Sequence, residues 1–132
     1  GDINYISIGE SSNVQDGVIG HLSDHFPLIV GNFVTIGHGA ILHACTIEDE
    51  CLIGMGATIL DGARIGTQSI IAAGTVVPAG MEVPPGSLVA GVPGKFKKAL
   101  KDEERAKLRS WAEKSRVVKE AHRKLEQKGE VS

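Results

Sequence analysis

Residues 41–77 read ILHACTIEDECLIGMGATILDGARIGTQSIIAAGTVV, and the spacing within this stretch decides the fold. An aliphatic residue recurs every six positions, and a small residue follows each of the first six after four positions, beginning with Ile41 and Cys45. A helix would need a repeat near 3.6 residues, so the pattern excludes one. A short strand and a tight turn suit a unit of six, and three units form a triangular coil. The aliphatic positions are Ile41, Ile47, Ile53, Ile59, Ile65, Ile71 and Val77.

The repeat predicts an all-β solenoid, a parallel β-helix whose aliphatic side chains fill a triangular prism. Like positions of neighbouring coils should pair at about 4.7–4.9 Å. The same pattern continues towards the N-terminus in shifted phase from Ile8, which gives roughly four coils over residues 1–95. Glycines that directly follow an aliphatic position, such as Gly54, should mark points where the backbone of another coil comes close.

The composition changes near residue 95. Of the 14 Lys and Arg residues, only Arg64 precedes Lys95. From about Asp102 to Lys128 apolar residues recur at steps of three and four, so residues 96–132 should form an amphipathic helix and tail. We expect this helix to pack on the β-helix, either its own or that of a neighbour. Acidic residues interrupt the basic ones and no aromatic ladder accompanies them, so we expect no nucleic-acid partner.

Composition also bears on the environment of the chain. No stretch approaches the ~18 apolar residues of a membrane span, and no charged-then-apolar leader opens the chain. We therefore expect a cytoplasmic protein without a membrane segment, although a truncated chain would have lost any N-terminal targeting segment. Cys45 and Cys51 take the small inward position on different faces, which is typical of reduced thiols in a core.

Three histidines, His21, His38 and His43, fall at one position of the repeat. When the aliphatic positions are taken in threes, His21 and His43 each come two residues after a third-face position, Ile19 and Ile41. They should therefore stack on adjacent coils. His38 takes the same position on the second face.

Two imidazoles one ladder spacing apart can reach the same metal ion with nitrogens at ~2.0–2.1 Å, and three with an open fourth position form a catalytic zinc site. Because His38 points from another face, it cannot meet His21 and His43 within one prism. The economical solution is a closed homotrimer in which His38 of one subunit completes a site begun by the other two histidines of its neighbour. His25 and His122 fall outside this pattern.

At these histidines the sequence resembles a known family. The runs Asn13-Val14-Gln15-Asp16, residues 37–43 and residues 52–57, with the Pro-Gly-Lys ending at Lys95, are similar to the γ-class carbonic anhydrases and their carbonic anhydrase-like hexapeptide-repeat homologues. The resemblance runs from residue 1 to about residue 95, and the helical tail matches the family's plan. It implies a left-handed β-helix and a homotrimer with metal sites at the subunit interfaces. Each site would hold zinc, or iron or cobalt, through His21 and His43 of one chain and His38 of the next.

The activity that the resemblance implies is that of a carbonate dehydratase, a lyase. It is the reversible hydration of carbon dioxide to bicarbonate by a metal-bound hydroxide. By the same resemblance, Gln15 would hydrogen-bond the metal-bound water or bicarbonate, and Asn13 would orient the substrate. Asp16 shares the repeat position of His38 one coil away, so it would support the ligands or the interface, with a salt bridge or corner turn as an equal alternative. Asp2 would pair with an interface arginine.

The sequence departs from the family pattern in two places. Family members carry an arginine and further coils before the Gly-Asp pair that opens this chain, so we expect a fragment or a naturally short form. Well-studied active members also use a glutamate in the loop after the first histidine as a proton shuttle, whereas residues 22–29 read LSDHFPLI. Asp24 or His25 is the candidate relay, since an imidazole with a pKa near ~6.5 suits that task.

Two functions of other classes remain open. A hexapeptide-repeat acyltransferase would use one histidine as general base at a coenzyme A channel and needs no metal. A non-catalytic trimeric scaffold would keep the metal for stability. Three histidines at one repeat position favour the metalloenzyme.

Overall fold

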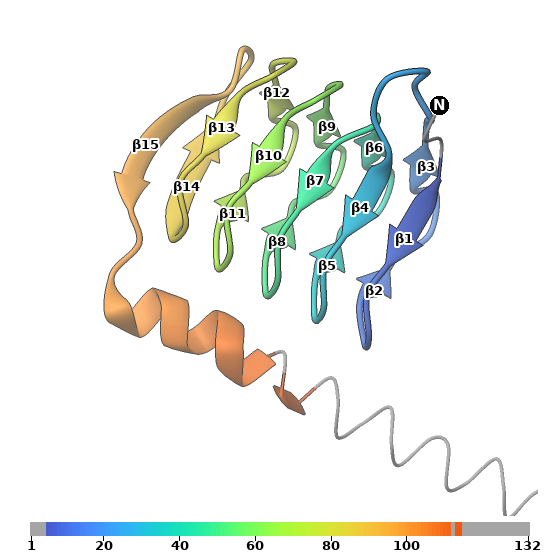
Figure 1. The fold of residues 1–132 in the computed structure, drawn as a ribbon. Coiled ribbons are helices and arrows are strands. Elements are labelled where there is room, and N and C mark those ends of the chain that lie inside the picture. The colour runs from blue at the N-terminus through green and yellow to red at the C-terminus, as the bar shows by residue number, and fades with distance from the viewer. Residues whose placement is uncertain (1–4, 112, 115–132) are drawn as a thin grey trace, which may run out of the picture.

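The computed structural model describes residues 5–111, 113 and 114, and it shows a β-solenoid followed by one helix (Figure 1). Successive short strands along the chain belong to three different sheets, and all neighbours but one pair in parallel. The first sheet contains β1 (Ile6–Ile8), β4 (Leu28–Val30), β7 (Thr46–Ile47), β10 (Arg64–Ile65) and β13 (Glu82–Val83). The second contains β2 (Asn13–Val14), β5 (Thr35–Ile36), β8 (Leu52–Ile53), β11 (Ile70–Ile71), β14 (Ser87–Ala90) and β15 (Lys95–Ala99). The third contains β3 (Ile19–Gly20), β6 (Ile41–Leu42), β9 (Thr58–Ile59) and β12 (Val76–Val77).

The core is the aliphatic column that the repeat predicts. On the first sheet Ile47 pairs with Ile65, and on the second Ile53 pairs with Ile71; all four side chains are fully buried. Complete burial of such a side chain contributes roughly 1.5–3 kcal/mol relative to leaving it exposed. The small residues four positions later are buried as well, as at Ala57. The predicted solenoid is therefore confirmed, with aliphatic strands and small corner residues.

The third sheet has a register that differs from the prediction. Leu42, and not Ile41, is the buried residue of β6, and it pairs with the buried Ile59. Ile41 pairs with Thr58 and is only half-buried. Assigning Ile41 to the interior was therefore wrong, because two adjacent aliphatic residues left the inward position ambiguous.

The repeat is one residue short in the coil that contains β6. Leu42 follows Ile36 by six residues, so the repeat is unbroken there, and the short interval falls between Leu42 and Ile47. Ala44 and Cys45 are both buried at this tightened corner. A longer loop interrupts the repeat after His21, since β3 ends at Gly20 and β4 begins at Leu28.

Close approach of neighbouring coils accounts for the glycine at position 54. A Cβ atom at Gly54 would collide with the backbone nitrogen of Ala73, which belongs to the next coil. Backbone cannot withdraw as a flexible side chain would, so a residue without Cβ is required. Gly54 donates its N–H to the Ile71 carbonyl at 2.8 Å, which fixes the spacing between these coils.

The C-terminal end of the solenoid extends beyond the predicted four coils. Strands β13 and β14 add another coil, and β15 then turns back to run antiparallel to β14. The repeat does not predict β15, whose residues are all exposed and largely basic. The strand begins at Lys95, where we placed the end of the β-helix.

The corner between the first and second sheets carries a ladder of residues in the left-handed conformation. Phe33, Glu50 and Gln68 have φ angles of 56°, 58° and 55°, and Gly86 takes the same place in the next coil with 68°. Each is joined to its neighbour coil by a backbone hydrogen bond, such as that from the Gln68 N–H to the Asp49 carbonyl at 3.0 Å. A non-glycine residue in this conformation costs roughly 1–2 kcal/mol. The corner is therefore regular but strained.

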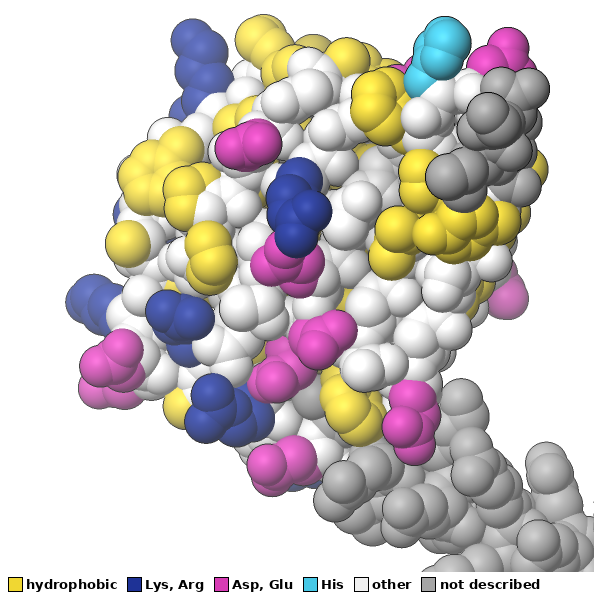
Figure 2. All heavy atoms as spheres, viewed as in Figure 1, with side chains coloured by type: hydrophobic (Ala, Val, Ile, Leu, Met, Phe, Trp, Pro, Cys, Tyr) yellow, Lys and Arg dark blue, Asp and Glu magenta, His cyan; other side chains and the backbone are white. Residues whose placement is uncertain are grey.

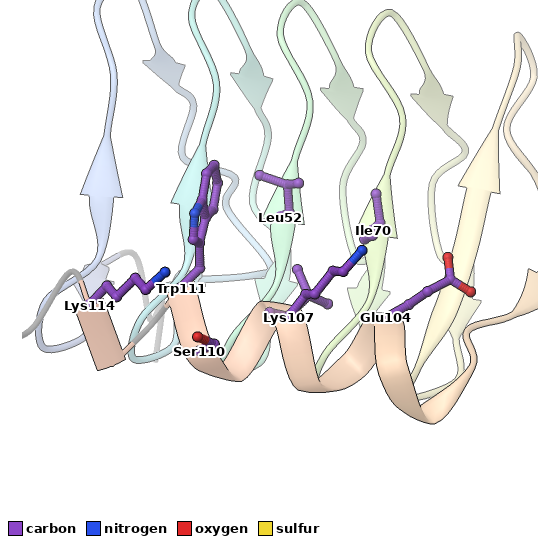
Figure 3. A pocket seen from close by; sticks show the side chains of 8 residues that line it. Leu52, Ile70, Glu104, Lys107, Ser110, Trp111 and Lys114 are labelled. Carbon is purple, nitrogen blue, oxygen red and sulfur yellow. The ribbon is translucent and has the colours of Figure 1, made fainter.

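The C-terminal helix begins at residue 102 and runs beside the second sheet of its own chain (Figure 3). Leu108 and Trp111 of the helix face Leu52 and Ile70 of the sheet across a groove of about 450 Å³. The predicted helix is thus present for the described residues, and the predicted continuation to Lys128 lies outside them. Among the described residues no helix has the length and apolar character that a membrane crossing requires.

Charges of both signs are interspersed over the face seen in Figure 2. The Arg64 guanidinium pairs with the Glu48 carboxylate at 2.6 Å on the first sheet. Apolar side chains are exposed at the N-terminal end of the described solenoid, where Ile8 of β1 and Ile19 of β3 are about half accessible, at 53% and 50%. The N-terminal coil has a neighbouring coil on one side only within the described residues.

Candidate metal centre

His21 and His43 stack on one another at the end of the third sheet. Strands β3 and β6 pair in register, and each is followed directly by a histidine. The ring centroids are 4.9 Å apart with an interplanar angle of 23°, and the His21 N–H donates to the Leu42 carbonyl at 2.7 Å. This separation equals one coil spacing. The stacking expected from the repeat is present, because parallel pairing places equivalent side chains one above the other.

His38 lies at a different corner of the prism. It occupies the turn after β5, two residues beyond the buried Ile36, and its side chain is exposed. His43, in contrast, comes one residue after the buried Leu42. The three histidines therefore do not share one repeat position, which corrects the prediction and follows from the shifted register of β6.

One chain by itself brings two of the three histidines together. Across residues 5–111, 113 and 114, no group of three or more His, Cys, Asp or Glu side chains is arranged to hold a metal ion. The chemistry of the pair itself fits a metal such as zinc, since both are imidazoles on adjacent coils and both are accessible.

Asn13, Gln15 and Asp16 follow one another along the coil that pairs with the His38 coil. Asn13 pairs with Thr35 in the ladder, and the Gln15 N–H donates to the Ile36 carbonyl at 3.0 Å. The Asp16 carbonyl accepts a hydrogen bond of 3.0 Å from the Gly39 N–H. Asp16 thus lies one coil from His38, as predicted, and Gln15 is half-buried whereas Asn13 is exposed.

The loop between β3 and β4 carries the candidate proton relay. Asp24 and His25 are both exposed, and the His25 N–H donates to the Ser23 hydroxyl at 3.1 Å. Phe26 turns back onto the solenoid and lies over Gly62, where a Cβ atom would be 3.4 Å from the ring. The loop is thereby held against the corner beside His43. Asp2 lies outside the described residues.

An acidic residue that was not among the sequence-predicted site residues lies against His43. One carboxylate oxygen of Asp61, Oδ1, is 4.0 Å from Nδ1 of His43 and accepts a hydrogen bond of 3.1 Å from the Ala44 N–H. The available signal was register: Asp61 directly follows Leu60, and the His43 N–H bonds to Ile59 in that coil. Asp61 is followed by Gly62, and an Asp-Gly pair is typical of an ordinary turn, so the sequence did not indicate that Asp61 lies beside a histidine.

The two cysteines are separate from this centre. Both are free and buried, and burial raises the pKa of each thiol to about 12. The Cys51 thiol contacts the Gly66 carbonyl at 3.2 Å. Such thiols are neutral and poorly reactive, which agrees with the predicted core role.

Comparison with known proteins agrees with the repeat and the fold. Residues 44–79 match the family model described as bacterial transferase hexapeptide (six repeats). A crystal structure of a hexapeptide transferase family protein from Anaplasma phagocytophilum superposes with a TM-score of 0.79 and 37% identity, covering 88% of this chain and 68% of that one. The chain belongs to the hexapeptide-repeat family.

Within the hexapeptide-repeat family, curated relatives include named carbonic anhydrases. The chain is 51% identical over 104 residues to a protein of Methanocaldococcus jannaschii named "probable carbonic anhydrase", covering 79% of this chain and 65% of that protein. It is 40% identical over 128 residues to "gamma carbonic anhydrase 1, mitochondrial" of Arabidopsis thaliana, covering 92% of this chain and 46% of that protein. The chain thus spans about half to two thirds of the length of these relatives.

Acyltransferases of the hexapeptide-repeat family share the fold at lower identity. An acetyltransferase of Vibrio cholerae, solved in complex with acetyl coenzyme A, has a TM-score of 0.66 and 27% identity over 75% of this chain and 65% of that one. The fold is shared by the relatives named carbonic anhydrase and by the acyltransferases, so it does not decide between these two activities.

Proposed function

We propose that this chain forms a γ-class carbonic anhydrase-like metalloenzyme that hydrates carbon dioxide reversibly to bicarbonate at the interfaces of a homotrimer. The observation that carries the proposal is the stacked pair His21 and His43, with ring centroids 4.9 Å apart. Support comes from relatives named carbonic anhydrase at 40% and 51% identity.

The donor set fits a zinc ion, with iron or cobalt as alternatives of similar preference for imidazole. His21 and His43 would hold the metal from one subunit, and His38 of an adjacent subunit would complete the set. The position of His38 at another corner of the prism supports a ligand shared between chains, since a closed three-fold assembly presents that corner to a neighbour.

A zinc ion bound by three imidazoles supplies a nucleophile from water at neutral pH. The chain's own side chains would do the rest. The half-buried Gln15 would donate its amide N–H to the bicarbonate oxygen, and Asn13 would orient carbon dioxide before attack. The exposed imidazole of His25, four residues from His21, would pass the released proton to solvent, with Asp24 as the alternative acceptor.

Complementation between subunits tests the shared site. His38→Ala and His43→Ala proteins should each bind almost no zinc alone, because every interface lacks one ligand. After the two proteins exchange subunits at equal ratio, about one site in four should regain all three ligands, since each intact site needs one subunit of each kind in the right order. Zinc stoichiometry and carbon dioxide hydration should both recover to about that level.

The control is a mixture of His38→Ala with the double variant His38→Ala, Asp49→Asn, which exchanges subunits but can form no intact site. Recovery that fails despite proven exchange would exclude the shared site. Zinc recovery without hydration would instead favour the non-catalytic scaffold.

The acyltransferase is the second candidate, because the Vibrio cholerae neighbour was solved with acetyl coenzyme A. Calorimetric titration of the metal-free protein with acetyl coenzyme A separates the two functions. We expect no saturable binding; micromolar binding that survives His21→Ala and His43→Ala would favour acyl transfer.

A further inference from the structure

Asp61 occupies a fixed place beside the imidazole of His43. Its Oδ1 atom accepts the Ala44 N–H at 3.1 Å and lies 4.0 Å from Nδ1 of His43. The Asp61 side chain is half exposed, whereas that of His43 is one-third exposed, at 33%. A backbone hydrogen bond on the residue after the histidine thus holds the carboxylate against one particular ring nitrogen.

Other corners of the solenoid show that this backbone bond does not require a carboxylate. The Asn32 amide oxygen accepts the Glu10 N–H at 2.7 Å, and the Asp49 carboxylate accepts the Asn32 N–H at 2.7 Å. In both cases a side chain from one coil bonds a corner N–H of the previous coil, as Asp61 does. An amide oxygen can therefore accept the corner N–H of the previous coil as a carboxylate oxygen does. Within the described residues, Asp61 is the only member of this set of three that also faces a histidine.

We propose that Asp61 is a positioning residue that selects the His43 tautomer with its proton on Nδ1, leaving the Nε2 lone pair free for a metal ion. The inference rests on the proposed function, because it assigns His43 as a ligand. A ligating imidazole usually donates its other ring N–H to a carboxylate or carbonyl, which fixes the ring and increases its basicity. The 4.0 Å between Nδ1 of His43 and Oδ1 of Asp61 is longer than a hydrogen bond. Hydrogen bonds in functional sites often shorten only when the ligand is bound.

Three single variants separate the positioning role from the corner role. Asp61→Ala removes both the charge and the acceptor for the Ala44 N–H, whereas Asp61→Asn keeps an acceptor and removes only the charge. Asp49→Ala is the matched control, since it removes an equivalent corner acceptor far from any described histidine contact. Thermal melting reports the corner bond: Asp61→Ala and Asp49→Ala should both melt at a lower temperature than the unaltered protein, and Asp61→Asn should melt above Asp61→Ala.

Zinc affinity, measured by competition with a chromophoric chelator, should fall about 10–100-fold in Asp61→Ala and by a smaller factor in Asp61→Asn. The Asp49→Ala protein should bind zinc as the unaltered protein does. Equal zinc affinity in the unaltered protein and both Asp61 variants would overturn the proposal.

A measurement on the metal-free protein tests the role of Asp61 separately from the proposed metalloenzyme function. In ¹⁵N-labelled metal-free protein at about pH 8, where an ordinary imidazole is neutral, long-range ¹H–¹⁵N spectra report the tautomer, and His43→Gln assigns the signal. We expect Nδ1–H at His43 in the unaltered protein and a shift towards Nε2–H in Asp61→Ala. An unchanged tautomer would refute the role of Asp61 whether or not zinc binds. A protein that binds no zinc but shows the tautomer shift would refute the metalloenzyme and leave the Asp61–His43 contact established.

Discussion

Arg105 of the C-terminal helix donates a hydrogen bond of 2.9 Å from Nε to Oε1 of Gln68, a nearly buried corner residue 37 positions earlier in the chain. The Gln68 amide in turn donates to the Glu50 carboxylate at 3.2 Å. Arg109, one helical turn after Arg105, lies 3.7 Å from the same carboxylate. Helix and solenoid corner are therefore joined by a continuous polar chain that runs across two coils.

Two substitutions at Gln68 should separate this docking from backbone strain. Gln68→Ala and Gln68→Gly both lose the bond to Arg105, which should cost about 1–2 kcal/mol. Only glycine adopts the φ of 55° without strain, so Gln68→Gly should be more stable than Gln68→Ala by about 1 kcal/mol. Urea unfolding measures both differences, and hydrogen exchange in residues 102–111 should be faster in both variants. Slow exchange in both would mean that the helix docks without this bond.

Adjacent residues of β6 test the register of the third sheet. Leu42→Ala should lower the free energy of unfolding by about 2–5 kcal/mol, because it leaves a cavity in the column. Ile41→Ala should cost less than about 1.5 kcal/mol, because its side chain is half-buried on the outer surface. Chemical denaturation of both variants checks this order. The reverse order would restore Ile41 to the interior.

Alkaline pH should destabilise the fold through its thiols. Burial raises the pKa of Cys45 and of Cys51 from the ordinary 9.0 to about 12. The unfolded chain therefore loses these protons first, so stability is complete below about pH 9 and declines as pH rises towards about 12. Urea midpoints at about pH 8 and about pH 10, on either side of the ordinary thiol pKa, measure the loss. The decline should be shallower in Cys51→Ala than in the unaltered protein, and identical slopes would contradict the assignment.

Removal of metal should lower stability without unfolding the solenoid. The column around Ile53 and Ile65 is fully buried and lies apart from the histidines, so the fold does not depend on them. Saturation with zinc at about 100 times its dissociation constant would add about 2.7 kcal/mol, which chelation should remove. Far-UV circular dichroism should stay unchanged after chelation while the melting temperature falls. Loss of the β signal itself would favour a metal-stabilised scaffold.

Periodicity is a strong predictor where each coil repeats the same local choice. Ile53 and Ile59 are buried because an aliphatic residue, a glycine or turn, and a small corner residue recur in phase with the strand and turn geometry. The stacking of His21 on His43 could be predicted from the sequence for the same reason, since parallel pairing places equivalent residues of adjacent coils one above the other. The solenoid and this stacked pair are thus predictable from the order of residues along the chain.

The remaining features depend on information that the repeat does not contain. Whether Ile41 or Leu42 points into the core depends on which repeat unit is one residue short. Both residues are similarly apolar, so the sequence does not decide between them. Asp61 lies beside His43 because the coil that contains it pairs in parallel with the His43 coil, and the turn residues Asp61-Gly62 give no sign of that contact in the sequence. Strand β15 has the composition of a solvated tail. The left-handed sense, the boundary at residue 95, the trimer and the three metal ligands stay predictions.

The left-handed corner ladder at Glu50, Gln68 and Gly86 limits how this architecture can change in length. Four helical residues advance about 6.0 Å and a coil about 4.8 Å, so contacts at every fourth helical residue meet successive corners with a drift of about 1.2 Å per coil. Insertion or deletion of a whole coil would move the anchoring corners by one turn of the helix. Homologues that keep the Arg105–Gln68 contact should therefore gain or lose about four helical residues with each coil, which couples two kinds of indel in the evolutionary history of the chain.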